Sequence, residues 1–138
     1  MMLELYVIWV LGAYLCGSIQ VGDLVSKFAR VDIRSRGTGN PGAANVFREI
    51  SPIYGFVVFS LDVAKGAAVI MPIYFVDLLG FDPSPWVVSV VAVVALGGHI
   101  FPIGWRSIGG TGMAVTMGTT AALLPIGTIL SGPIAVGI

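Results

Sequence analysis

The sequence predicts an all-α protein: a polytopic bundle of about four membrane-spanning helices that forms one integral-membrane domain over residues 1–138. Three observations predict this class. The 138 residues are 57% hydrophobic and only 10% charged, whereas a soluble domain carries roughly a quarter charged residues. The mean hydropathy is +0.98, and one soluble core of this size could not bury so much apolar surface. Disorder is excluded because disordered segments are polar and rich in charge.

The first expected span covers about residues 5–27. No charged residue occurs from Leu5 to Gly22, and Asp23 and Lys27 follow. We expect one continuous helix that runs on to about Ala29 as it leaves the bilayer.

The second and third expected spans cover about residues 53–76 and 85–105. Asp62 and Lys65 interrupt the apolar sequence of the second span, whereas the third is free of Asp, Glu, Lys and Arg and carries His99 near its end. Ionisable side chains inside a span must face protein or water, because each costs about 2.5 to 3.5 kcal/mol at the centre of a bilayer.

The fourth expected span covers about residues 113–136. Pro125, Gly127 and the Gly132-Pro133 pair are expected to kink or break it. The sequence ends without a polar tail, so either the carboxylate lies at the membrane surface or the natural polypeptide continues.

The distribution of basic residues predicts the orientation. The link between the first two spans carries most of them, Arg106 lies between the third and fourth spans, and residues 77–84 have no Lys or Arg. The positive-inside rule then places both termini outside and two glycine-rich loops in the cytoplasm. The basic residues of the first link are Lys27, Arg30, Arg34, Arg36 and Arg48.

Charge and cysteine content exclude other classes of protein. The formal net charge is zero, so binding to nucleic acid is not expected. The single cysteine, Cys16, cannot form an internal disulfide, and without a Cys/His cluster no metal site is expected. The N-terminus lacks the features of a signal peptide and is expected to be a retained span.

The first glycine-rich loop has the composition of an anion site. Three glycines within Gly37–Gly42 allow close approach of backbone N–H groups, and a helix over Ala43–Arg48 would add the guanidinium of Arg48. Thr38, Asn40 and Asn45 supply neutral donors. A flexible cytoplasmic turn, with arginines that only obey the positive-inside rule, explains the same residues.

The second loop, Gly109-Gly110-Thr111-Gly112, has a weaker version of this pattern. It precedes an apolar segment, so its N–H groups would also face the cytoplasm. It lacks the spacing of a nucleotide-binding P-loop, and a flexible connection remains the alternative.

Four further residues have both a functional and a structural interpretation. Asp62 and Lys65 share a helix face and either form a buried ion pair or present Lys65 as an anion ligand that Asp62 positions. His99 could be a base or a phosphate donor, but no carboxylate lies four residues later, so a structural histidine is the main alternative. Ser18 fits a helix-packing contact better than a nucleophile.

Taken together, these motifs resemble the bacterial acyl-phosphate–glycerol-3-phosphate acyltransferases of the PlsY type. The resemblance extends from Gly17 to about Leu124, and five motifs occur in the order and spacing of that family. They are Gly17-Ser18-Ile19 with Gly22, Gly37-x-Gly39-Asn40-x-Gly42-Ala43-x-Asn45-x-x-Arg48, Leu61-Asp62-Val63-Ala64-Lys65-Gly66, Gly98-His99-x-Phe101-Pro102 and Gly109-Gly110-x-Gly112.

The resemblance implies transfer of an acyl chain from acyl phosphate to the 1-hydroxyl of glycerol 3-phosphate, giving lysophosphatidic acid for phospholipid synthesis in the bacterial cytoplasmic membrane. It implies no metal and no cofactor. It places glycerol 3-phosphate at Thr38, Asn40, Asn45 and Arg48, and acyl phosphate at Gly109, Gly110 and Gly112. Ser18, Asp62, Lys65 and His99 would support the site, and the catalytic residues stay unassigned.

The sequence also departs from this family. Thr111 stands where the second glycine-rich motif of the family has a lysine, and the family has about seven spans and a third motif with His and Asn. A homo-oligomer or a partner could supply further helices. A catalytically inactive, truncated relative that binds a phosphorylated lipid precursor or a partner membrane protein is therefore the second interpretation.

Overall fold

The computed structural model describes residues 2–78, 83–104 and 108–124, and all regular structure within these ranges is helical. The predicted all-α class is confirmed for this part of the chain. The elements in chain order are α1 (Met2–Gly17), α2 (Val21–Phe28), the short 3₁₀ helix η1 (Ile33–Ser35), α3 (Ala43–Glu49), α4 (Pro52–Ile70), α5 (Pro72–Leu78), α6 (Pro85–Ile100) and α7 (Met113–Leu123).

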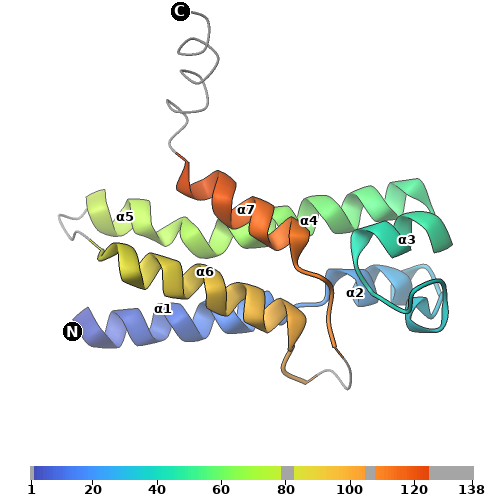
Figure 1. The fold of residues 1–138 in the computed structure, drawn as a ribbon, viewed down its shortest axis with the longest axis horizontal. Coiled ribbons are helices and arrows are strands. Elements are labelled where there is room, and N and C mark those ends of the chain that lie inside the picture. Colours follow the sequence, from blue (N-terminus) through green and yellow to red (C-terminus); the bar gives the residue numbers. More distant parts are fainter. Residues whose placement is uncertain (1, 79–82, 105–107, 125–138) are drawn as a thin grey trace, which may run out of the picture.

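The long helices pack as two close pairs. Figure 1 shows α6 lying along α1, and α7 lying across α4. Glycines allow this approach: a Cβ added at Gly17 would lie 2.1 Å from the carbonyl oxygen of Ala95, and one at Gly118 would lie 2.0 Å from that of Val63. Small residues at such contacts are typical of helix packing in membranes, where lipid gives helices no hydrophobic reason to associate.

The surface is apolar and much of the interior is polar. Large aliphatic and aromatic side chains are exposed along α1, α4 and α6, among them Leu11, Phe56 and Val93. In a soluble protein such a surface would be unfavourable, whereas in a bilayer it faces lipid. The buried polar and charged side chains are Ser18, Gln20, Asp23, Ser26, Asn45, Asp62, Lys65, His99 and Thr119.

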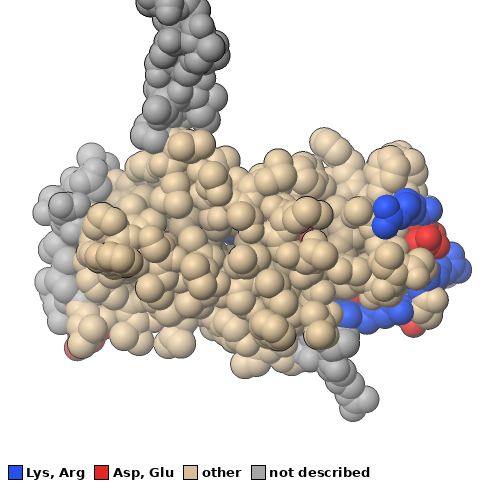
Figure 2. Space-filling model, in the orientation of Figure 1, with Lys and Arg blue, Asp and Glu red and all other residues tan. Residues whose placement is uncertain are grey.

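Charged side chains gather at one end of the molecule. Figure 2 shows Lys and Arg over α3 and the segment that joins it to α2, whereas the length of the bundle in this view is almost free of charge. The end with the basic residues is the one that the positive-inside rule assigns to the cytoplasm.

The structure corrects the expected continuity of the first helix. The segment expected as one helix to Ala29 is divided at Ser18–Gln20 into α1 and α2. The Ser18 hydroxyl donates to the carbonyl of Tyr14 at 2.8 Å, and Gln20 leaves the helical region with φ −87° and ψ 88°.

Two other helices also differ from the expected ranges. The second expected span is divided at Met71 into α4 and α5, because Pro72 has no N–H to continue the helix. The third ends at Ile100 rather than near Trp105, because Phe101 leaves the helical region with φ −120° and ψ 69° and Pro102 follows it.

Two segments are long and apolar enough to cross a membrane by length and composition, Leu3–Phe28 and Pro52–Phe75. α6 and α7 are shorter apolar helices. The later part of the expected span 113–136, together with Asp82 and Arg106, lies outside the described residues. The number of spans and the orientation therefore stay predictions.

Candidate functional site

A cleft of about 980 Å³ opens where α3, α4, α6 and the start of α7 meet. It combines a polar part with an apolar wall. Its lining residues are Thr38, Asn40, Gly42, Ala43, Ala44, Asn45, Phe47, Arg48, Gly55, Phe56, Phe59, Asp62, His99, Thr111, Gly112, Met113, Ala114 and Met117. All four residues expected to bind glycerol 3-phosphate are thus brought to one cavity with Asp62 and His99.

The first glycine-rich loop is held by its own side chains. The buried amide of Asn45 on α3 donates to the carbonyl of Arg36 at 3.1 Å and accepts the backbone N–H of Thr38 at 3.2 Å. Asn40 accepts the N–H of Gly42 at 2.7 Å. Gly37 has φ +52°, a conformation that favours glycine. Asn45 therefore shapes the loop with one amide N–H and its carbonyl oxygen.

Arg48 is the free cation of the cleft. It lies on the last turn of α3, which forms where a helix over Ala43–Arg48 was expected, and its side chain is exposed. No residue of the described ranges forms an ion pair or hydrogen bond with its guanidinium. Its donors remain available for a phosphate or carboxylate.

The second glycine-rich loop is buried and is held by distant residues. The N–H of Gly109 donates to the carbonyl of Ile100 at 2.8 Å, and that of Gly110 donates to Oε1 of Gln20 at 3.3 Å. The other end of the same Gln20 amide donates to the carbonyl of His99 at 3.0 Å. The N–H groups of Gly109 and Gly110 are therefore donated within the protein, and the expected binding of acyl phosphate at this loop stays a prediction.

The last two residues of the second loop, Thr111 and Gly112, line the cleft. Gly112 has φ +83° and lies at the N-terminus of α7. No side chain of the described residues caps that N-terminus, so the first backbone N–H groups of α7 can receive an anion.

Asp62, Lys65 and His99 form a buried cluster between α4 and α6. The Nζ of Lys65 lies 2.9 Å from Oδ1 of Asp62, which confirms the expected pairing, and 3.0 Å from Nδ1 of His99. Nδ1 of His99 is 3.9 Å from the same carboxylate oxygen. His99 thus has the carboxylate neighbour that its local sequence lacks.

The Lys65 ammonium is fully engaged. Besides His99 it donates to the carbonyls of Gly17 at 3.2 Å and Ile19 at 2.8 Å, where the break between α1 and α2 leaves them without helical partners. An ammonium has three protons, and these three acceptors use them. The geometry favours the structural interpretation of Lys65 over the role of anion ligand.

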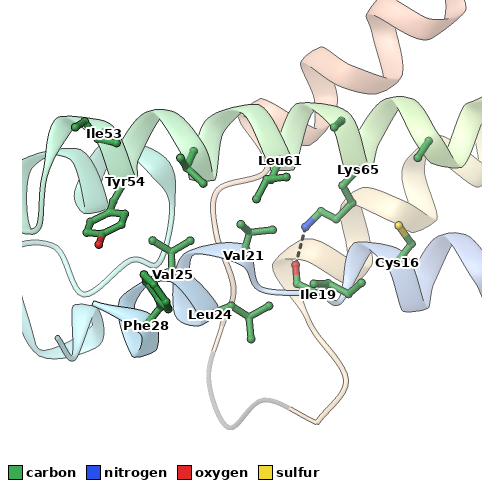
Figure 3. A pocket seen from close by; sticks show the side chains of 13 residues that line it. Cys16, Ile19, Val21, Leu24, Val25, Phe28, Ile53, Tyr54, Leu61 and Lys65 are labelled. Carbon is green, nitrogen blue, oxygen red and sulfur yellow. Dashed lines mark hydrogen bonds between the residues drawn. The ribbon is translucent and has the colours of Figure 1, made fainter. Parts of the chain in front are cut away.

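A second groove, of about 720 Å³, lies between α2 and α4 on the other side of Lys65. Figure 3 shows Lys65 reaching from α4 to the carbonyl of Ile19, with apolar side chains such as Leu24 and Leu61 along the groove. The side chain of Lys65 therefore lies between this apolar groove and the polar cluster of the main cleft.

Ser18 belongs to the helix break rather than to the cleft. Its hydroxyl donates to the carbonyl of Tyr14 and accepts the N–H of Ile103 at 3.3 Å. This favours the packing interpretation of Ser18.

Sequence reasoning missed two residues that join the loops. Gln20 connects the helix break to the second loop, as described above. Arg34 forms a bidentate ion pair with Asp23, at 2.9 and 2.6 Å, and donates to the carbonyl of Ile108 at 2.9 Å. The sequence signal for Gln20 was a polar residue at the end of an apolar segment, and that for Arg34 was one of several basic residues in the first link.

Within the described parts of the chain, no three His, Cys, Asp or Glu side chains are grouped so that they could hold a metal ion. The chemistry available in the cleft is that of hydrogen bonding and fixed charge: one free guanidinium, uncapped helix N–H groups, a carboxylate and an imidazole.

Comparisons with known proteins agree on one family. The model of the family described as glycerol-3-phosphate acyltransferase matches residues 7–138. A glycerol-3-phosphate acyltransferase of Mycoplasmopsis pulmonis is 43% identical over 108 residues, which cover 78% of this chain and 48% of that protein. One of Halalkalibacterium halodurans is 37% identical over 136 residues, which cover 98% of this chain and 65% of that protein.

Two solved structures have the same fold. Both are crystal structures of PlsY (YgiH), described as an integral membrane glycerol 3-phosphate acyltransferase, at 32% identity. The glycerol 3-phosphate form aligns with a TM-score of 0.77 over 96% of this chain and 64% of that one. The lysophosphatidic acid form aligns with a TM-score of 0.75 over 93% and 61%. The chain spans about half to two thirds of the length of these relatives.

Proposed function

Because this chain belongs to the glycerol-3-phosphate acyltransferase family, we propose that it transfers an acyl group from acyl phosphate to the 1-hydroxyl of glycerol 3-phosphate. The products are lysophosphatidic acid and inorganic phosphate. The proposed setting is phospholipid synthesis at the cytoplasmic face of the bacterial membrane, with both glycine-rich loops on that side.

The observation that carries this proposal is one cleft with a free cation and an apolar wall. Arg48 lines its polar part without a partner among the described residues, and Phe56, Phe59, Met113 and Met117 line its apolar part. A phosphate ester needs the first environment and an acyl chain needs the second. A cavity for a small hydrophilic substrate alone would not need this wall.

In this proposal the phosphate of glycerol 3-phosphate binds at Arg48, with Thr38 and Asn40 beside it. The first loop presents these residues because Asn45 fixes its conformation. Arg48 neutralises the phosphate and holds the glycerol in the cleft, so that its hydroxyl is positioned against the donor.

The donor phosphate is proposed to bind at Thr111, Gly112 and the uncapped N-terminus of α7, where backbone N–H groups favour negative charge. Gly109 and Gly110 place this segment against His99. An acyl phosphate is an activated mixed anhydride. Positioning and charge neutralisation are therefore sufficient for transfer, and no covalent acyl-enzyme is required.

The test is incorporation of labelled glycerol 3-phosphate into lipid by the purified protein in detergent or nanodiscs. We expect lysophosphatidic acid when palmitoyl phosphate is the donor, and none with palmitoyl-CoA or palmitoylated acyl carrier protein. Arg48→Ala should lower the rate, and the exposed Arg36→Ala, which lies outside the cleft lining, serves as the matched control. Folded protein with no turnover above the protein-free blank would reject the activity.

A further inference from the structure

The carboxylate of Asp62 is charge-paired but accepts no hydrogen bond. Its Oδ1 is fully buried, and it has no hydrogen-bond donor in the described structure although Lys65 Nζ is 2.9 Å away. Lys65 does not donate to Asp62 because its three ammonium protons are donated to the carbonyls of Gly17 and Ile19 and to Nδ1 of His99. A buried carboxylate normally accepts several hydrogen bonds, so this one has unused capacity.

Asp62 is also positioned to use that capacity on a ligand. The residue is only 3% exposed, yet it lines the main cleft rather than the apolar groove. It therefore brings a carboxylate that is ion-paired with Lys65, but has no hydrogen-bond donor among the described residues, to the same cavity as Arg48.

His99 adds the complementary donor. Its Nδ1 accepts from the Lys65 ammonium, which places the proton of a neutral imidazole on Nε2. No partner for Nε2 is found in the described ranges, and His99 lines the cleft with Asp62. The cluster thus places an Nε2–H donor and a carboxylate acceptor in the lining of the same cleft.

A hydroxyl group matches this pair, because it donates one hydrogen bond and accepts others. A second phosphate does not match it, since an anion beside the Asp62 carboxylate would be repelled. Arg48 supplies the anion contact in the same cleft. The pair and Arg48 together fit a ligand with phosphate at one position and hydroxyl at another.

We propose that Asp62 and His99 form a hydroxyl subsite, in which a hydroxyl of the bound polyol phosphate donates to the Asp62 carboxylate and accepts from His99 Nε2–H. The inference rests on the proposed function, because it takes a polyol phosphate as the ligand. In this arrangement Lys65 positions Asp62 and His99 and does not touch the substrate.

The first experiment varies the ligand and leaves the protein intact. Binding to the full chain in detergent is measured by calorimetry for glycerol 3-phosphate, its 1-deoxy and 2-deoxy analogues and inorganic phosphate. We expect at least one deoxy analogue to bind about 10-fold or more weakly, because it leaves the buried pair unsatisfied. If both deoxy analogues bind within two-fold of glycerol 3-phosphate, the subsite is refuted without any variant.

The second experiment repeats the series with Asp62→Asn, which keeps the shape of the side chain but weakens the acceptor. The preference for glycerol 3-phosphate over the deoxy analogue should fall several-fold, while affinity for inorganic phosphate changes little. Asp32→Asn is the matched control, since Asp32 does not line the cleft and asparagine also caps helices well. An undiminished hydroxyl preference in folded Asp62→Asn contradicts the inference.

The outcomes separate this inference from the proposed function. Hydroxyl-selective binding without acyl transfer would refute the activity and keep the subsite. Acyl transfer without hydroxyl-selective binding would refute the subsite and keep the activity. Absence of any glycerol 3-phosphate binding to folded protein would refute both.

Discussion

The two glycine-rich loops differ in what holds them. The first is partly exposed and is shaped by neighbours in sequence, mainly Asn40 and Asn45. The second is buried at Gly109, Gly110 and Gly112 and depends on Gln20, about 90 positions away. A loop that is organised locally can leave its charged groups free for a ligand. A loop that is organised by the rest of the fold serves as a fixed part of the core.

The largest effect should come from the second loop. In Gly109→Ala the added Cβ would lie 1.8 Å from the carbonyl oxygen of His99, a backbone atom that cannot move aside. We expect a loss of about 3 to 5 kcal/mol in unfolding free energy, measured by thermal unfolding in detergent. Gly97→Ala on α6 is the control, since nothing lies within 4 Å of its Cβ. A Gly109→Ala protein as stable as Gly97→Ala would show that the buried packing of this loop is wrong.

The second largest loss of stability should come from Gln20→Leu. The leucine removes the acceptor for Gly110 N–H and the donor for the His99 carbonyl, and leaves both buried. We expect a cost of about 2 to 3 kcal/mol in the same unfolding assay. If Gln20→Leu is neutral while Gly109→Ala is severe, packing alone holds the second loop.

Arg48→Ala should separate binding from stability. The guanidinium has no partner in the described structure, so its loss should change the unfolding free energy by less than about 0.5 kcal/mol. Affinity for glycerol 3-phosphate should fall about 10-fold or more, because a charge-assisted contact is lost. The measurement is the ligand-induced shift in melting temperature, with Arg36→Ala as the control. An unchanged shift in Arg48→Ala would mean that the first loop does not bind the phosphate.

Of the two glycine substitutions, Gly39→Ala in the first loop is expected to have the smaller effect on stability. Gly39 has φ +69°, and an added Cβ would lie 3.0 Å from the carbonyl oxygen of Arg34. The strained backbone should cost about 1 kcal/mol. A loss as large as that of Gly109→Ala would remove the distinction between a locally held loop and a core-held loop.

The local features of this protein could be predicted from sequence. The helical class follows from apolar composition, and α3 with Arg48 follows from a glycine-rich turn before a short helical segment. The pairing of Asp62 with Lys65 follows from their spacing of three positions on one helix.

The long-range features could not be predicted in this way. Lys65 and His99 are 34 positions apart on different helices, so no spacing rule relates them. The break at Ser18–Gln20 carries no proline, and its stability comes from Lys65, whose contacts with it span 46 and 48 positions. Gln20 looked like an isolated polar residue at the end of an apolar segment, because its partners lie in α6 and the second loop.

The contact of Lys65 with the carbonyls of Gly17 and Ile19 has a consequence for biogenesis. The hydrocarbon core of a bilayer has no water to donate to a carbonyl without a hydrogen-bond partner. The N-terminal segment by itself would therefore leave the carbonyls of Gly17 and Ile19 unsatisfied in lipid. Those two oxygens gain their donor only when α4 has been synthesised and has docked. We therefore expect the first segment to reach its final state in the bilayer only together with the second, once α4 has docked.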